Sequence, residues 1–338
     1  MARISIALCT YNGERFLQEQ LDSYVCQTRL PDELVVCDDG STDGSLPILR
    51  DFANKAPFSV KIYENTVNLG FAKNFEKAIS FCTGDLIFLS DQDDVWMPEK
   101  IEAISKRFGH DPKLGMVFTD AQLVDENLSY LGFDFFGVPY NSEVRDALEK
   151  GSFLKALLFR NHISGATMAF RRRLVEYAIP LPGDEVPEMN HDGWIGFVAV
   201  LAGNYEFLDI PLIKYRQHRD QQIGMYEVKP KEQAGELEPA WGFEEASKYI
   251  RSDIKRISAI LNYFRDCNEL STHLPGLRNV ADPIIFELNR KLSHYTGRNN
   301  LPDSFLARTK YVLKETAAGN YHLFSNGTRS IAKDLLYL

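Results

Sequence analysis

Short apolar runs alternate with stretches of helical spacing over residues 1–110. Four of the runs are continuous and apolar, which is typical of strands buried on both faces of a sheet. They cover residues 3–9, 34–37, 60–64 and 85–90. Apolar residues at helical spacing predict helices over residues 14–26, 47–56 and 74–82. Strands that alternate with helices in this order predict an α/β fold with a mostly parallel central sheet.

The rest of the chain continues with shorter strands and then becomes helical. Strand-like runs occupy residues 116–119, 170–171, 205–208 and 213–215, with a helix over 193–202. We expect a loop and a helix within residues 134–152. Helical spacing returns over residues 244–270, 280–294, 303–317 and about 328–337. Because residues 226–242 are polar and contain Pro and Gly, we expect three regions: a domain over 1–224, a linker over 225–243 and a helical region over 244–338.

Polar residues directly follow three of the predicted strands, as Thr10-Tyr11-Asn12, Asp38-Asp39 and Asp91-Gln92-Asp93-Asp94. Ligands of parallel α/β sheets bind beyond the carboxyl ends of the strands, so we expect these clusters to share one edge. Carboxylates such as Asp91 and Asp93 suit Mg²⁺ or Mn²⁺, which can bridge a diphosphate. The alternative for each acidic cluster is a turn that caps the next helix, which for the last cluster starts near Pro98.

Two later segments also contain groups that can carry chemistry. In His191-Asp192-Gly-Trp194, a carboxylate beside an aromatic ring has the setting of a general base, or of a helix cap. In Tyr215-Arg216-Gln-His218, neutral His suits a metal and Arg suits a diphosphate, although a solvated loop is the alternative. Lys73 and Asn74 follow the third strand, where a plain helix start is the alternative.

Composition excludes several classes of protein. The net charge of −9 disfavours a nucleic-acid binder, which needs a basic surface. Five cysteines without C-x-x-C spacing predict reduced thiols in a cytosolic protein. The longest apolar stretch, residues 194–203, is far shorter than the roughly 20 residues of a membrane span. Neither the G-x-G-x-x-G nor the GxxxxGK[ST] phosphate-binding pattern is present. We expect a soluble protein, attached at most to a membrane surface.

Several segments together resemble the family 2 glycosyltransferases, which have the GT-A nucleotide-sugar-binding fold. They read CTYNGERFLQEQLDSYVCQT, VVCDDGSTDGS, NLGFAKNFEKAI, GDLIFLSDQDDVWMPEKI, HDGWIG and YRQH. The resemblance spans roughly residues 1–224, which would form the catalytic domain. SDQDDVW and YRQH look most like bacterial rhamnosyltransferases of surface-polysaccharide biosynthesis. The Gln-x-x-Arg-Trp motif of processive synthases is absent from the sequence.

The resemblance implies a set of residues that bind the donor nucleotide. The set follows the first four predicted strands: Thr10, Tyr11, Asn12, Glu14, Asp38, Asp39, Lys73, Asn74, Asp91 and Gln92. Within it, Asp39 matches the aspartate that accepts a hydrogen bond from the pyrimidine N3–H, and Asp91 would face the ribose.

The resemblance also implies the groups that carry the reaction. Asp93 and His218 would hold Mn²⁺ or Mg²⁺ on the diphosphate, and Asp192 matches the general base. His191 precedes this base where the family often has Glu. Trp194 and Arg216 are expected beside the acceptor or the diphosphate. A single displacement would move a sugar, such as L-rhamnose, from a dTDP- or UDP-linked donor to a hydroxyl of a cell-surface glycan with inversion.

The helical region has no motif of this kind. We expect most of its apolar residues to form packing contacts, and a smaller role at an anionic lipid surface for Lys310, Lys314, Arg329 and Lys333. Such contact would suit a lipid-linked acceptor and a cytoplasmic enzyme peripheral to the cell membrane. The alternatives to a glycosyltransferase are a sugar-1-phosphate nucleotidyltransferase, a phosphoacceptor receiver domain and a non-catalytic glycan-binding module on the same fold.

Overall fold

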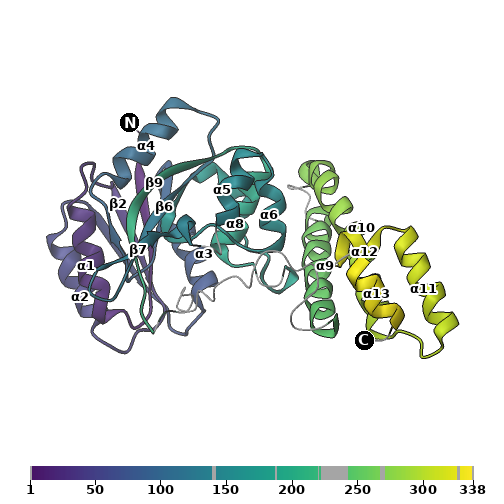
Figure 1. Ribbon diagram of the computed structural model, residues 1–338. Helices are drawn as coiled ribbons and strands as arrows, with labels where there is room; N and C mark the ends of the chain where they lie inside the picture. Colours follow the sequence, from purple (N-terminus) through teal and green to yellow (C-terminus); the bar gives the residue numbers. More distant parts are fainter. Residues whose placement is uncertain are drawn as a thin grey trace. The chain divides into compact units, whose positions relative to one another are not determined.

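The chain divides into two compact units, Met1–Lys229 and Pro230–Leu338. The structure is a computed structural model and describes residues 2–138, 142–186, 189–219, 221, 243–266, 271–325 and 328–336 (Figure 1). The predicted linker, residues 225–243, lies outside this description except for Phe243, so its prediction stands as made. None of the helices in these described ranges combines the length and the apolar character that crossing a membrane requires.

The first unit is built on a nine-stranded mixed sheet in which most strands run in the same direction. The spatial order is β3-β2-β1-β4-β8-β6-β9-β5, and β7 pairs with β6. Neighbours are parallel from β3 to β4 and between β6 and β9, whereas β5, β7 and β8 are antiparallel to their partners. The strands are β1 (Ile4–Thr10), β2 (Glu33–Asp38), β3 (Ser59–Glu64), β4 (Leu86–Ser90), β5 (Val95–Trp96), β6 (Met116–Val124), β7 (Tyr130–Asp134), β8 (Met168–Arg171) and β9 (Tyr205–Arg216).

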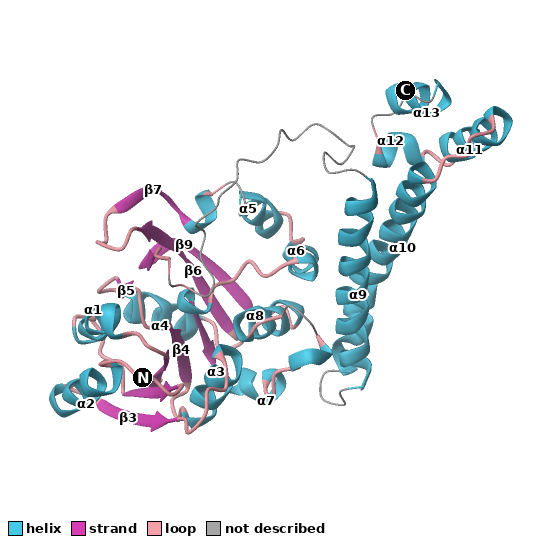
Figure 2. Ribbon diagram, turned by 90° about the horizontal axis from the view of Figure 1, so that it is seen from below, coloured by secondary structure: helices cyan, strands magenta, loops and turns pink. Residues whose placement is uncertain are grey.

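Helices cover both faces of this sheet. They are α1 (Glu14–Val25), α2 (Ser45–Lys55), α3 (Phe71–Phe81), α4 (Lys100–His110), α5 (Ser142–Glu149), α6 (Phe153–Phe159), α7 (Val175–Ala178) and α8 (His191–Leu201). Figures 1 and 2 show α1 and α2 on one side of the sheet and α3 and α8 on the other. Right-handed crossovers place α1 and α2 opposite to α3, because the chain moves one way from β1 to β3 and the opposite way from β3 to β4.

The main hydrophobic core lies between the sheet and helices α1, α2 and α4. Alternate residues of β1, Ile4, Ile6 and Leu8, point into it together with Leu17 of α1 and Ile104 of α4. All of these side chains are fully buried. The continuous apolar runs that predicted β1, β2 and β4 therefore correspond to strands buried on both faces, and the predicted α/β fold is confirmed.

The structure differs from the predicted elements in two informative places. Residues 209–211 do not separate two strands, because β9 runs through them with a register shift against β6. The helix-cap alternatives are wrong for Asp91–Asp94 and for Asp192, whereas the loop after β2 does form the alternative turn: Asp38 Oδ1 accepts the Ser41 N–H at 2.8 Å, and Asp43 Oδ1 accepts the N–H of Ser45, the first residue of α2, at 3.0 Å. α4 begins only at Lys100 after Glu99, and α8 begins at His191, so that Asp192 lies inside the first turn. Asp192 instead accepts the N–H of Gly193 within that first turn, at 2.7 Å.

The second unit is helical, as predicted. Its helices are α9 (Phe243–Asp266), α10 (Leu274–Asn299), α11 (Phe305–Ala317), α12 (Asn320–Phe324) and α13 (Thr328–Leu336). Helix α10 begins earlier than predicted, with Pro275 in its first turn, and it tolerates Pro283 inside. Ala246 and Ile250 of α9 pack with Tyr295 and Phe324 in a small apolar core.

Candidate active site

Loops after β1, β2 and β4 meet at one edge of the sheet, as the strand pattern predicts. The Tyr11 N–H donates to Gln92 Oε1 at 2.8 Å, and Gln92 Nε2 donates to the Tyr11 carbonyl at 3.1 Å. Thr10 Oγ1 donates to Asp38 Oδ2 at 2.8 Å. A Cβ atom at Gly13 would lie 2.3 Å from Gln92 Oε1, so a larger residue there would displace the Gln92 side chain from its contact with Tyr11. Residues from three separate loops thus form one continuous surface.

The loop after β1 is tied to the loop after β2 by side chains predicted to line a nucleotide pocket. Asn12 adopts a left-handed backbone (φ 48°), and its Oδ1 accepts the Thr42 N–H at 2.9 Å. Glu14 Oε2 accepts the Gly44 N–H at 2.8 Å. These contacts hold the turn after Asp39 against the start of α1 and leave Tyr11 exposed at the edge.

Asp39 is almost fully buried and orders a third loop. Its carboxylate accepts the N–H groups of Leu69 and Gly70 at 2.8 and 2.9 Å and a hydrogen bond from Asn65 at 2.7 Å. Asn74 is buried beside this group, and its amide donates to the Cys37 carbonyl at 2.8 Å. Three of the roughly four acceptor sites of this carboxylate are thus occupied within the protein, and the assignment of Asp39 to the pyrimidine stays a prediction.

Lys73 differs from its neighbours in this region. Its side chain is exposed on the first turn of α3, where the ammonium pairs with Glu76 of the same helix at 2.9 Å. The assignment of Lys73 to the donor site stays a prediction.

The residues after β4 form a dense acidic cluster. Burial, together with the neighbouring carboxylates of Asp93 and Asp192, raises the pKa of Asp91 to about 8. Asp94 is fully buried; its Oδ1 accepts the Arg216 N–H at 2.9 Å, while its Oδ2 has no partner. Burial and the same cluster raise the pKa of Asp94 as well. Carboxylates so crowded and so poorly hydrated are stabilised when a cation joins them.

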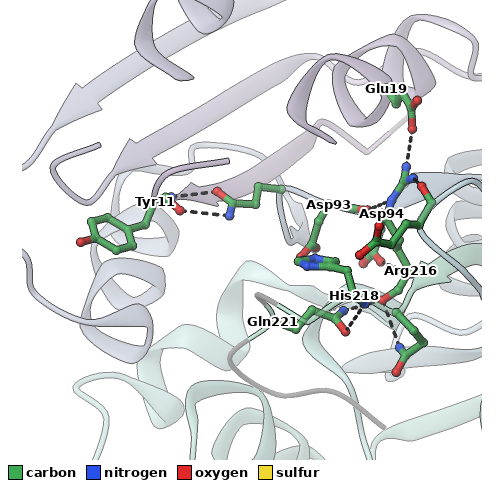
Figure 3. Close-up of polar contacts among 10 residues, drawn as sticks. Tyr11, Glu19, Asp93, Asp94, Arg216, His218 and Gln221 are labelled. Atoms are coloured by element: carbon green, nitrogen blue, oxygen red, sulfur yellow. Dashed lines mark hydrogen bonds and ion pairs between the residues drawn. The ribbon is translucent and has the colours of Figure 1, made fainter. Parts of the chain in front are cut away.

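Asp93 and His218 fit the requirements of such a cation. The Oδ2 atom of Asp93 and the Nε2 atom of His218 lie 2.9 Å apart, in loops after β4 and β9 (Figure 3). This spacing also suits two ligands of one small divalent ion. Within the described ranges no group of three or more His, Cys, Asp or Glu residues has a metal-binding arrangement. Two protein ligands are consistent with Mg²⁺ or Mn²⁺ that is completed by water and phosphate oxygens.

Asp192 is held from three directions in the first turn of α8. Its Oδ1 accepts hydrogen bonds from Asn161 Nδ2 at 3.0 Å and from the Gly193 N–H at 2.7 Å, and its Oδ2 accepts the Gly165 N–H at 3.1 Å. The carboxylate is only partly buried, and its charge acts on Asp91. It is therefore an oriented, partly exposed carboxylate beside the acidic cluster. The neighbouring His191 stacks on Phe75 with ring centroids 4.0 Å apart.

Two predicted site residues are structural instead. Trp194 is fully buried, and its indole N–H donates to the Ala178 carbonyl at 3.1 Å, so it does not contact an acceptor. The predicted role of Arg216 at the diphosphate is also wrong. Its buried guanidinium donates to the carbonyls of Asp93 and Glu126 and pairs with Glu19. Both side chains are buried, and their polar groups are bound by other parts of the protein.

The structure adds residues that the sequence did not single out. Asn161 and Gly165 come from a loop without a motif, and Lys100 lies under the acidic cluster as the first residue of α4. Only Lys100 offered a signal, since it belongs to the segment MPEKI that continues the acidic motif.

Comparison with known proteins agrees with this geometry. Residues 5–175, half of the chain, match the description "Glycosyl transferase family 2". The chain belongs to glycosyl transferase family 2. This family 2 transferase is 25% identical over 304 residues to an uncharacterized glycosyltransferase of Haemophilus influenzae, with 87% of each chain covered. It is 29% identical over 264 residues to an uncharacterized glycosyltransferase of Nostoc sp., covering 75% of this chain and 76% of the relative.

A solved structure shares the architecture of this transferase. The crystal structure of S. aureus TarS in complex with UDP-GlcNAc is 17% identical and has a TM-score of 0.53. The match covers 97% of this chain and 92% of the TarS chain. The fold is thus an α/β GT-A fold with a helical C-terminal region.

Proposed function

We propose that this transferase moves a sugar from a pyrimidine nucleoside diphosphate to a glycan hydroxyl with inversion. The observation that carries the proposal is the convergence of Asp91, Asp93 and His218 beside the oriented carboxylate of Asp192. The UDP-GlcNAc complex of TarS supports a nucleotide-sugar donor for this fold. Because the motifs SDQDDVW and YRQH resemble those of bacterial rhamnosyltransferases, dTDP-L-rhamnose is the first donor to test.

The proposed reaction is a single displacement. Asp192 accepts the proton of the acceptor hydroxyl while that oxygen forms a bond to the anomeric carbon. The bond between this carbon and the diphosphate oxygen breaks, and the nucleoside diphosphate leaves with the electron pair. Asp93 and His218 would hold a divalent cation, which when bound would supply positive charge to stabilise the leaving diphosphate. Tyr11, Asn12 and Glu14 belong to the loops that would surround the nucleotide.

Donor binding and its metal dependence are tested by thermal shift. The probes are dTDP-L-rhamnose, UDP-GlcNAc, UDP-glucose and GDP-mannose, each with and without Mn²⁺. A donor at about 100 times its Kd stabilises the folded protein by about 2.7 kcal/mol. We expect one pyrimidine donor to raise the Tm only with Mn²⁺, and Asp93→Ala to remove this increase. Asp51→Ala, which changes an exposed carboxylate on α2, is the control. An equal response of Asp93→Ala and the wild type would exclude Asp93 as a metal ligand.

The base is tested with the donor that this panel selects. Hydrolysis of the donor uses water in place of the unknown acceptor and releases nucleoside diphosphate. We expect Asp192→Asn to lower this turnover by about 10²–10⁴-fold, because a positioned base contributes that much, while the thermal shift by the donor persists. Turnover at the wild-type rate in Asp192→Asn would contradict the assignment.

We further propose that the helical unit attaches the enzyme to the cytoplasmic surface of the cell membrane, near a lipid-linked acceptor. On α11, Leu306 and Leu313 are 80% and 64% exposed, and Lys310 and Lys314 are exposed with them. Their spacing places apolar and basic side chains on one stripe of the helix, which suits an anionic interface.

Flotation with phosphatidylglycerol vesicles tests this attachment. We expect binding at low salt that weakens at high salt and is lost in the double variant Lys310→Glu/Lys314→Glu, with Lys55→Glu on α2 as the control. Absence of binding at low salt would refute the membrane role without affecting the transferase assignment.

A further inference from the structure

The side chain of Lys100 is fully buried, and it interacts electrostatically with Asp91 and Asp94 of the candidate active site. Lys100 is the first residue of α4, and its Nζ donates to the Ala166 carbonyl at 2.5 Å. The same Nζ lies 3.9 Å from the ring centroid of Trp96, in a cation–π contact. Burial lowers the pKa of Lys100 to about 7, although Asp94 and Asp91 act in the opposite direction. Burial of a lysine is costly, and the Ala166 carbonyl and the Trp96 ring are contacts that offset this cost.

The carbonyl that Lys100 binds belongs to a short turn against the proposed base. Ala166 is the middle residue of the 3₁₀ turn Gly165–Thr167, and the Gly165 N–H donates to Asp192 Oδ2. A Cβ atom at Gly165 would lie 3.4 Å from the Asp192 Cβ and 3.1 Å from the His191 Nε2. The turn is therefore in direct contact with the first turn of α8.

We propose that Lys100 is a positioning residue for the reaction: it fixes the turn Gly165–Thr167, and this turn orients the carboxylate of Asp192. This inference rests on the proposed role of Asp192 as the base. The link runs from the Lys100 ammonium to the Ala166 carbonyl, and from the Gly165 amide to Asp192 Oδ2. Lys100 itself takes no part in the chemical step and acts on Asp192 through the turn.

The test uses Lys100→Met, which keeps an unbranched apolar side chain one atom shorter and removes the charge and the hydrogen-bond donor. Lys106→Met is the matched control, because Lys106 is on the same helix but exposed and paired with Glu102. Gly165→Ala disturbs the same link from the other side and serves where Lys100→Met does not fold. Each variant is made in the full chain, alone and combined with Asp192→Asn.

The rate of donor hydrolysis measures the coupling between Lys100 and Asp192. We expect Lys100→Met to lower kcat by up to about 10²-fold, since small displacements of a catalytic group have effects of this size, while the Kd of the donor stays unchanged. In the Asp192→Asn background, the additional effect should be less than about 3-fold, because residues that act as one unit are not additive. A purely structural role would instead lower stability and give additive losses in the double variant.

Hydrogen–deuterium exchange over residues 161–168 gives a readout that does not depend on activity. We expect exchange of this segment to accelerate in Lys100→Met and to stay at the wild-type rate in Lys106→Met. Unchanged exchange, or a full additional loss of kcat in the double variant, would overturn the role of Lys100. Wild-type turnover of Asp192→Asn alone would instead refute the proposed base, so the two failures are distinguishable.

Discussion

Single residues in this protein show how buried carboxylates are stabilised by different means. Glu33 has a fully buried side chain that accepts hydrogen bonds from Ser5 Oγ at 2.6 Å and from the Thr83 N–H at 2.6 Å, and pairs with Lys61 at 2.9 Å. Burial by itself would raise its pKa, but these partners outweigh burial and lower the pKa of Glu33 to about 2. Asp91 and Asp94 lack comparable donors, and their pKa values rise. Glu33 is therefore stabilised by its protein partners, whereas the charges of Asp91 and Asp94 remain poorly compensated.

Replacement of the well-paired carboxylate should therefore cost stability in a pH-dependent way. We expect Glu33→Gln to lower the free energy of unfolding by about 2 kcal/mol at pH 7. Because the folded state depresses the pKa of Glu33, its contribution is complete above the ordinary pKa of 4.5 and is lost as the pH falls toward 2. Urea unfolding of both proteins at pH 7 and pH 3.5 measures this difference.

Glu64→Gln is the matched control, since Glu64 lies at the end of the neighbouring strand β3 and pairs with Arg50 while half-exposed. Its replacement should change stability by less than about 0.5 kcal/mol. An equal loss in the two variants, or a loss in Glu33→Gln that grows at acid pH, would contradict the account of Glu33.

At the scale of elements, the site depends on contacts that join loops from distant parts of the chain. Arg216 at the end of β9 donates through Nε to the Asp93 carbonyl at 2.7 Å and also binds the Glu126 carbonyl and the Glu19 carboxylate of α1. One guanidinium thus joins β9, α1 and the loops after β4 and β6. The candidate metal ligands Asp93 and His218 lie on two of these segments, so Arg216 sets the distance between them.

A lysine at this position keeps the charge but cannot reproduce the planar fork of donors. We expect Arg216→Lys to lower the Tm by about 5 °C and to weaken the Mn²⁺-dependent thermal shift by a donor at least several-fold. Arg50→Lys, at an exposed ion pair, should leave both quantities at the wild-type values. Full retention of the Mn²⁺ response by Arg216→Lys would show that the Arg216 guanidinium does not position the candidate metal ligands.

At the scale of the whole molecule, each unit has a buried network of its own. In the second unit, Arg298 binds both carboxylate oxygens of Asp334 at 2.6 and 2.8 Å and the Ser325 hydroxyl at 2.9 Å. His294 joins Ser325 to Glu315, with distances of 2.9 and 2.8 Å. These contacts connect α10, α11 and α13 within the helical unit.

The separate networks predict separate unfolding. Arg298→Met leaves the buried Asp334 without its charge partner, which should destabilise the helical unit by about 3–5 kcal/mol. We expect calorimetry to show one transition that moves to lower temperature and a second that keeps both its Tm and its shift by donor with Mn²⁺. Arg265→Met, at an exposed pair with Asp266, is the control. A single transition that shifts as a whole would show that the two units unfold together.

The sequence by itself determined the order of strands and helices and the edge where the site forms. Continuous apolar runs require burial on both faces, and parallel strands bring their carboxyl ends to one edge, so the loops at Tyr11, Asp38 and Gln92 had to meet. The pairing of Asp93 with His218 agrees with the motif that predicted it. These features follow from local patterns and from the geometry that every sheet of this kind shares.

Only the tertiary structure decided which polar side chains face the site and which are buried in support of it. Arg216 and Trp194 stand in functional motifs, yet packing turns both into the interior. Lys100 and Gly165 stand in no recognised catalytic position, yet the fold links them to Asp192. The physical reason is that the direction and burial of a side chain depend on neighbours contributed by remote segments. No local pattern in the chain encodes those neighbours.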